Sequence, residues 1–240
     1  MTSADERPDR PRTIGVLNES SLHASLKAWR ALPGDATEVV VDQFVIDIVR
    51  GDTLIEIQTS NLGAIRAKLQ RLLRQHKVQV VYPIAQVKHL IYVDPTSNEV
   101  VRRRKSPRHG HIADVFEALV RIPTLMREPN FSLLVVLTQE EEVRCVNDQP
   151  RRRRRRAHVI DRRLVRVIEQ VQFDTVNDLC KLLPQDLPTP FTNRMLADHM
   201  SISIHVARKM TYSLKKLGVI QQTGKEGRAF LFEFTQIKSN

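Results

Sequence analysis

The chain has 240 residues, of which 41% are hydrophobic and 27% are charged, so it has enough apolar material for a folded core and is not disordered throughout. Lysine and arginine number 38 against 27 aspartates and glutamates, a net charge of +11, which predicts a polyanionic partner, most simply nucleic acid. No apolar run in the sequence approaches the ~18 residues of a membrane span, and its two cysteines cannot build a disulfide scaffold. We therefore expect a cytoplasmic protein with no membrane partner.

The basic charge is concentrated in the C-terminal part. Residues 1–150 hold 20 basic and 19 acidic residues, a balance of +1, whereas residues 151–240 hold 18 and 8, a balance of +10. The run Arg151 to Arg156 contributes +6 of the second balance. Such an asymmetry predicts parts with different roles: a disordered tail (1–13), a first domain (14–146), an arginine-rich linker (147–160) and a second domain (161–240).

The first domain is predicted to be mixed α/β. Helical spacing of apolar residues favours helices over residues 20–31, 61–76 and 111–127. Runs rich in Val, Ile and Phe predict strands over residues 39–49, 53–59, 78–82, 87–93 and 131–138. This order of elements predicts an α/β fold in which a mixed β-sheet is flanked by helices.

One predicted hairpin contains the candidate catalytic residues of this domain. Its loop is Gly51-Asp52, a dipeptide that suits a two-residue turn. Counting outward from the loop places Asp47 opposite Glu56, with Gln58 on the same side of the sheet. Two opposed carboxylates about 5 Å apart repel by roughly 3 kcal/mol at an effective dielectric of ~20. A Mg²⁺ ion, which prefers carboxylate oxygens, would remove that repulsion.

This arrangement resembles the PD-(D/E)xK nuclease superfamily, on the basis of Asp47 at the end of one strand and Glu56-Ile57-Gln58 on the next, followed by a helix. The resemblance implies a restriction-endonuclease-like fold in which Asp47 and Glu56 hold Mg²⁺ or Mn²⁺. Gln58 stands where most members have Lys, and the resemblance implies that it orients the attacking water. It also implies a further acidic ligand from the first helix, which matches Glu19.

A purely structural role for these residues stays open. An Asp at a strand end and a Glu on a sheet face are commonly solvated, and Glu19 can be a charge that the start of a helix favours. A second basic cluster over residues 102–111 is predicted to be a loop. Arg104 and Lys105 are its candidate phosphate contacts, and an ordinary solvated loop is the alternative.

The second domain is predicted to contain two short helices within residues 161–183, a helix that opens at Phe191-Thr192, a longer helix over 204–217 and a hairpin over 219–234. The last three elements resemble a winged helix-turn-helix domain, whose second helix enters the major groove of DNA. A winged helix that binds protein is the alternative. The resemblance implies the following DNA contacts: Ser203, His205, Arg208, Lys209, Tyr212, Lys215, Lys225 and Arg228.

Together these features predict a Mg²⁺-dependent endodeoxyribonuclease that a C-terminal winged helix delivers to DNA. The main alternative is a non-enzymatic DNA-binding protein, whose degenerate nuclease fold serves dimerisation or partner docking. An RNA-processing nuclease is a third option. The layout also resembles end-cleaving subunits of some transposons, which implies a partner protein from a mobile element or defence system. A homodimer is a further expected partner, because many nucleases of this class work as dimers.

Overall fold

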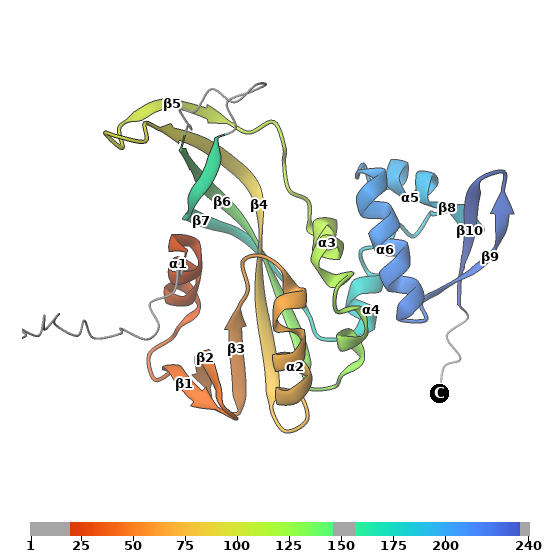
Figure 1. Cartoon of the computed structure of the whole chain (residues 1–240). Coiled ribbons are helices and arrows are strands. Elements are labelled where there is room, and N and C mark those ends of the chain that lie inside the picture. The colour runs from red at the N-terminus through yellow and green to blue at the C-terminus, as the bar shows by residue number, and fades with distance from the viewer. Residues whose placement is uncertain (1–19, 146–156, 236–240) are drawn as a thin grey trace, which may run out of the picture.

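The computed structural model describes residues 20–145 and 157–235. Its main feature is a seven-stranded mixed sheet in the order β1-β2-β3-β4-β6-β7, with β5 paired to β4 (Figure 1). The strands β3, β4 and β6 are parallel, and the other pairs are antiparallel. The bounds are β1 (Ala36–Val41), β2 (Phe44–Arg50), β3 (Thr53–Ile57), β4 (Lys77–Val93), β5 (Val100–Lys105), β6 (Phe131–Cys145) and β7 (His158–Phe173).

Helices cover both faces of this sheet, so the predicted α/β class with a mixed, helix-flanked sheet is confirmed. On one face lies α1 (Ser21–Arg30), which begins where the Ser20 side chain accepts a hydrogen bond from the His23 backbone N–H. Its Leu22 and Leu26 are buried against Ile48 and Ile55. The other face carries η1 (Leu62–Ile65), α2 (Arg66–Leu72), η2 (Ile112–Val115), α3 (Phe116–Leu119) and η3 (Pro123–Arg127).

Strand β4 is continuous over 17 residues, where the sequence predicted two strands. It pairs with β6 along nearly its whole length, and on its other side it pairs with β3 over residues 77–81 and with β5 over residues 89–93. Pro83 lies between these two pairings. A proline, which has no N–H, fits in a strand where that side has no neighbour. The described part of the sheet therefore has an unpaired stretch of β4 between the end of β3 and the start of β5.

The predicted strand over residues 39–49 is a hairpin. Asp42 and Gln43 both have positive φ, 46° and 64°, and they connect β1 to β2, which pair antiparallel. Neither residue is glycine, so the sequence gives little sign of a turn that requires positive φ at two positions.

Residues 158–173 form a strand, so the prediction of two helices within residues 161–183 is wrong for most of that range. Strand β7 pairs antiparallel with β6, and three extra residues on β7 (Ile160, Val165 and Ile168) interrupt the register as β-bulges. The helix in this range is the short α4 (Val176–Cys180). The first sheet thus extends past the predicted boundary at residue 161, and the arginine run at residues 151–156 lies outside the described residues.

The C-terminal elements follow the predicted order. They are β8 (Phe191–Thr192), α5 (Asn193–His199), α6 (Ile204–Lys216), β9 (Ile220–Glu226) and β10 (Ala229–Phe234), with the three strands in the order β8-β10-β9. The side chains of Thr192 and Ser203 cap α5 and α6 by accepting backbone hydrogen bonds. Gly218, at φ +72°, follows the end of α6.

These C-terminal elements share one hydrophobic core with the sheet. Helix α6 packs against α3, η2 and η3, as its position beside α3 in Figure 1 shows. Met210 and Leu214 of α6 belong to the same buried cluster as Val80 of β4 and Phe116 of α3. Within the described residues no helix is long and apolar enough to cross a membrane.

Candidate functional site

The hairpin of β2 and β3 has the predicted loop and register at its closed end. Its pairs are Arg50 with Thr53, Val49 with Leu54, and Ile48 with Ile55. Beyond Ile48 the two strands separate, and β3 continues beside β4, with Glu56 paired to Val80. The predicted pairing of Asp47 with Glu56 is therefore not formed. Instead both carboxylates flank the gap that opens between the strands.

Asp47 bridges this gap with its side chain. Its Oδ2 accepts a hydrogen bond from the Ile57 backbone N–H at 2.7 Å and lies 3.2 Å from Nε2 of His23 on α1. Burial alone would raise the pKa of Asp47, but the hydrogen bonds from His23 and Ile57 outweigh it and lower that pKa. Asp47 is thus held as a carboxylate.

Glu56 is buried on the opposite face of the sheet from α1, with 5% of its surface exposed. The Nζ of Lys68 on α2 lies 2.6 Å from Glu56 Oε1 and donates to the carbonyl oxygen of Val45 at 2.6 Å. Burial raises the pKa of Glu56 to about 7, against the lowering effect of Lys68. Despite the ion pair, the Oε1 atom has no hydrogen bond of correct geometry among the described residues.

These four side chains act on one another as one electrostatic group. The charge of Asp47 contributes to the raised pKa of Glu56, while His23 lowers it, and Lys68 contributes to the lowered pKa of Asp47. Sequence reasoning missed both Lys68 and His23. Each lies in a segment predicted to be helical, residues 20–31 and 61–76, but no pattern distinguishes Lys68 from the other basic residues of α2.

The two carboxylates match a divalent cation in ligand type and number. Mg²⁺ usually binds through one or two carboxylates and completes its coordination with water, and Asp47 and Glu56 supply that number. The Glu56 Oε1 atom is already ion-paired with Lys68 at 2.6 Å, so a bound cation would share this carboxylate with the Lys68 amine. Among the described residues no group of three or more His, Cys, Asp and Glu side chains gathers for a metal. Glu19, the predicted third ligand, lies outside the described residues.

Gln58 directly follows the last residue of β3 and is still hydrogen-bonded to β4. Its backbone N–H donates to the Val81 carbonyl at 2.9 Å, and its side-chain Nε2 donates to the carbonyl oxygen of Asn61 at 3.1 Å. Because side chains alternate along paired strands, Gln58 shares a face with Glu56 and with Tyr82 on β4. Gln58 therefore lies on the same face of the sheet as Glu56, and its side chain contacts the chain at Asn61.

A buried ion pair holds the turn that follows Gln58. Arg162 of β7 donates through Nη1 to the Thr59 carbonyl at 2.8 Å, and its Nε and Nη2 reach Glu140 Oε2 at 3.1 and 2.9 Å. Glu140 is fully buried and also accepts a hydrogen bond from Thr138 Oγ1. Arg162 thus ties the end of β3 to β6 and β7.

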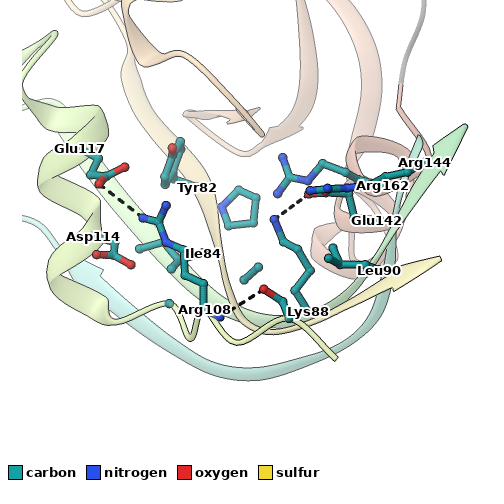
Figure 2. Close-up of a pocket in the computed structure, with 14 residues that line it drawn as sticks. Tyr82, Ile84, Lys88, Leu90, Arg108, Asp114, Glu117, Glu142, Arg144 and Arg162 are labelled. Atoms are coloured by element: carbon teal, nitrogen blue, oxygen red, sulfur yellow. Dashed lines mark hydrogen bonds and ion pairs between the residues drawn. The ribbon is translucent and has the colours of Figure 1, made fainter. Parts of the chain in front are cut away.

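A pocket of about 340 Å³ lies beside the unpaired stretch of β4 (Figure 2). Its lining includes Tyr82 and Ile84, basic side chains from β4, β6, β7 and the loop after β5, and three carboxylates. Gly110 closes this loop against β4, since a Cβ there would lie 2.6 Å from the Ala85 carbonyl oxygen. The charged residues are Lys88, Arg108, Arg144, Arg162, Asp114, Glu117 and Glu142.

Residues 20–174 match a family described as "Domain of unknown function (DUF8091)". The chain belongs to the DUF8091 family. The matched region runs from α1 to just past β7, so it contains the whole large sheet, the carboxylate group and the pocket. A protein of Treponema pallidum (strain Nichols), described as an uncharacterized protein, is 29% identical over 221 residues, which are 92% of this chain and 87% of that protein. No solved structure matches the DUF8091 chain.

The predicted DNA contacts lie partly on one surface. On α6, the exposed residues His205, Arg208, Tyr212 and Lys215 follow a single helical face, whereas Lys209 is half-buried. Ser203 is exposed and caps this helix.

The other predicted contacts lie on two hairpins. Lys225 and Arg228 are exposed on the β9–β10 hairpin, with Lys225 Nζ 5.0 Å from the centre of the Phe230 ring. Arg104 and Lys105 are exposed on β5, so the prediction that residues 102–111 form a loop is wrong as far as residue 105.

Proposed function

We propose that this DUF8091 protein is a metal-dependent nuclease that hydrolyses phosphodiester bonds of DNA. The observation that carries the proposal is the grouping of Asp47, Glu56 and Lys68 where β2 and β3 separate. A phosphodiesterase needs ligands for a cation and a positive group for the charge that develops on the phosphate, and this grouping supplies both.

Each member of the group has a distinct role in the proposed reaction. Asp47 and Glu56 would hold Mg²⁺ or Mn²⁺, which when bound supplies a nucleophile at neutral pH and charge stabilisation on the phosphate. Lys68 would contact a phosphate oxygen and neutralise the charge that develops on it. Gln58 donates through its amide nitrogen to Asn61, so its amide oxygen is left to accept a hydrogen bond from the attacking water.

Lys68 supplies the positive charge that Gln58 lacks. Most nucleases of the PD-(D/E)xK superfamily have Lys at the position of Gln58, and an amide side chain cannot provide that positive charge. The Lys68 amine reaches the same carboxylate from α2, at 2.6 Å from Glu56. The positive charge is therefore present at the site, although it comes from a different element of the fold.

The C-terminal elements support DNA as the substrate. The exposed face of α6 and the basic β9–β10 hairpin suit a winged helix that binds the major groove and the backbone, and the chain carries a net charge of +11. We expect this activity in the cytoplasm, because Cys145 and Cys180 are both free thiols. The proposal also includes the protein's partners: a second copy of the chain, or a partner protein of a mobile element or defence system.

A non-enzymatic DNA-binding protein is the second candidate. It is favoured by the observation that each carboxylate has a basic partner, His23 for Asp47 and Lys68 for Glu56. Such pairing can balance the buried charges without a metal. In this case the large sheet would serve as a scaffold for docking, and the C-terminal elements would carry the DNA contacts.

Plasmid nicking by the full chain separates the two candidates. Supercoiled plasmid is incubated with Mg²⁺ or Mn²⁺, and we expect nicking by the wild type and a loss of at least about a hundredfold in Asp47→Asn and Glu56→Gln. Asp52→Asn is the matched control, because Asp52 is an exposed carboxylate in the loop of the same hairpin. DNA binding without nicking in either metal contradicts the nuclease and supports the binding protein, whereas cleavage of RNA in preference to DNA contradicts the substrate.

A further inference from the structure

We propose that the pocket beside β4 binds a phosphate group of the DNA strand that is cut at Asp47 and Glu56. This inference rests on the proposed function and specifies where the substrate strand runs after it leaves the carboxylates. It assigns a ligand to Lys88, Arg108 and Arg162, whose side chains line the pocket.

The pocket adjoins Glu56, because Tyr82 of its lining lies on the same face of the sheet as that carboxylate. Tyr82, which lines the pocket, lies one strand across and two residues along from Glu56 in the β3–β4 register. Strand geometry converts that offset to about 8 Å between their Cα atoms. Arg162 joins the two places physically, since it lines the pocket and donates to the carbonyl of Thr59, next to Gln58.

Basic side chains from separate elements converge on the cavity. Lys88 comes from β4, Arg108 from the loop after β5, and Arg162 from β7. Figure 2 shows Lys88 reaching toward Glu142 and Arg108 toward Glu117, with Tyr82 near the other end of the lining. An ammonium group has three N–H donors and a guanidinium has five, so each can serve its protein partner and a phosphate oxygen together.

Two of the three carboxylates of the lining are already engaged. Glu142 accepts from Lys88 at 2.9 Å and from Arg144 at 2.7 Å, so one carboxylate serves two cations. Asp114 accepts from the backbone N–H of His111 in a capping box.

Arg108 is the cation with the weakest protein contact in this lining. Its Nη2 lies 3.5 Å from Glu117, and 71% of its side chain is exposed. A phosphate oxygen that enters the pocket would give Arg108 a shorter, charge-assisted hydrogen bond.

The size of the pocket suits one nucleotide of a strand. Its volume of about 340 Å³ lies at the lower end of the range for ligand pockets. Tyr82, Ile84 and Leu90 give it a partly apolar lining against which a sugar or base can pack. A duplex rises about 3.4 Å along its axis per nucleotide of one strand, so an offset of about 8 Å places the pocket's phosphate one or two nucleotides from the one at Glu56.

Binding of a labelled DNA duplex to the full chain in EDTA tests this proposal without any cleavage. We expect Arg108→Gln to weaken binding and to reduce the slope of log K against log salt by about 0.9, the value for one lost phosphate contact. Lys88→Gln should act in the same direction. Lys181→Gln is the matched control, because Lys181 is likewise an exposed cation paired with a carboxylate, but it lies just after α4 and outside the pocket.

The outcomes distinguish this pocket from the nuclease proposal. Equal losses in Arg108→Gln and Lys181→Gln, or no loss in Arg108→Gln, overturn the pocket whatever the plasmid assay shows. A deoxynucleoside monophosphate that binds as tightly as the duplex, with sensitivity to Arg108→Gln, overturns the assignment to a DNA strand in favour of a free nucleotide. A selective loss in Arg108→Gln supports the pocket even if no metal gives nicking.

Discussion

The Lys68 amine lies 2.6 Å from the Glu56 carboxylate and 2.6 Å from the carbonyl oxygen of Val45. Val45 belongs to β2 and Glu56 to β3, so one helical side chain contacts both strands at the point where they part. The charge on Lys68 therefore stands inside the gap that also holds Asp47. This relationship makes Lys68 the residue whose replacement is most informative.

Lys68→Met should lower the rate of metal-dependent nicking by about a hundredfold or more, because a preorganised donor to the developing phosphate charge is lost. Met retains the length of the side chain, and the raised pKa of Glu56 allows that buried carboxyl to stay protonated without its cation, so the fold should persist, as circular dichroism would show. Lys77→Met provides the control, since Lys77 pairs with Asp52 at 2.7 Å on the exposed end of the same sheet. Equal activity in Lys68→Met and the wild type would contradict the role of this amine.

Glu56 should make the protein less stable as the pH rises. Burial raises the pKa of Glu56 in the folded protein to about 7 from 4.5, so between these values the folded state binds more protons than the unfolded state. The free energy of unfolding therefore falls as pH increases through this window, by up to about 3 kcal/mol. Glu56→Gln should remove this dependence and be more stable than the wild type at pH 8.

Urea unfolding of both proteins in EDTA at pH 5, 6, 7 and 8 measures this difference. Other titrating groups contribute to both profiles and cancel in the comparison. Parallel profiles for the wild type and Glu56→Gln would show that Glu56 is ionised in the folded protein at ordinary pH.

Removing one partner of the buried pair of Glu140 and Arg162 should lower the free energy of unfolding more than replacing both partners does. Arg162→Met leaves a fully buried carboxylate without its cation, and we expect a loss of about 3–5 kcal/mol in the free energy of unfolding. The double variant Arg162→Met with Glu140→Gln should lose less than Arg162→Met alone. Additive losses in a double-mutant cycle by urea unfolding would rule out direct coupling of the two side chains.

The shared core predicts that α6 and the sheet unfold together. Leu214→Ala removes a fully buried side chain of α6, which should cost about 2–5 kcal/mol. Trp29, the single tryptophan of the chain, lies on α1 at the other side of the sheet. Its fluorescence should report a lower midpoint of urea unfolding in Leu214→Ala, and an unchanged midpoint would mean that the two parts unfold independently.

The closed end of the β2–β3 hairpin was predictable because a two-residue loop and strict alternation fix it. The separation after Ile48 was not, because it depends on β3 pairing with β4, which follows 20 residues after β3 in the chain. His23 and Lys68 come from helices on opposite faces, and their approach to the carboxylates depends on packing that no local pattern encodes. The two carboxylates could therefore be proposed as metal ligands from the sequence, but the basic groups around them could not be predicted.

Strand β7 escaped prediction for a different reason. Three extra residues, Ile160, Val165 and Ile168, shift the alternation each time they occur, so the apolar positions do not follow a period of two. Its pairing with β6 also joins segments separated by the arginine run. The C-terminal helices, in contrast, were predicted closely because Thr192, Ser203 and Gly218 mark their ends locally.

The same three bulges also change the edge of the large sheet. Strand β7 is the last strand of the large sheet in the described part of the chain, and it is 16 residues long. A straight edge of that length would offer a continuous row of free backbone groups to a neighbouring chain and invite aggregation. The bulges bend the strand and interrupt that row, a feature that disfavours the addition of another strand at this border.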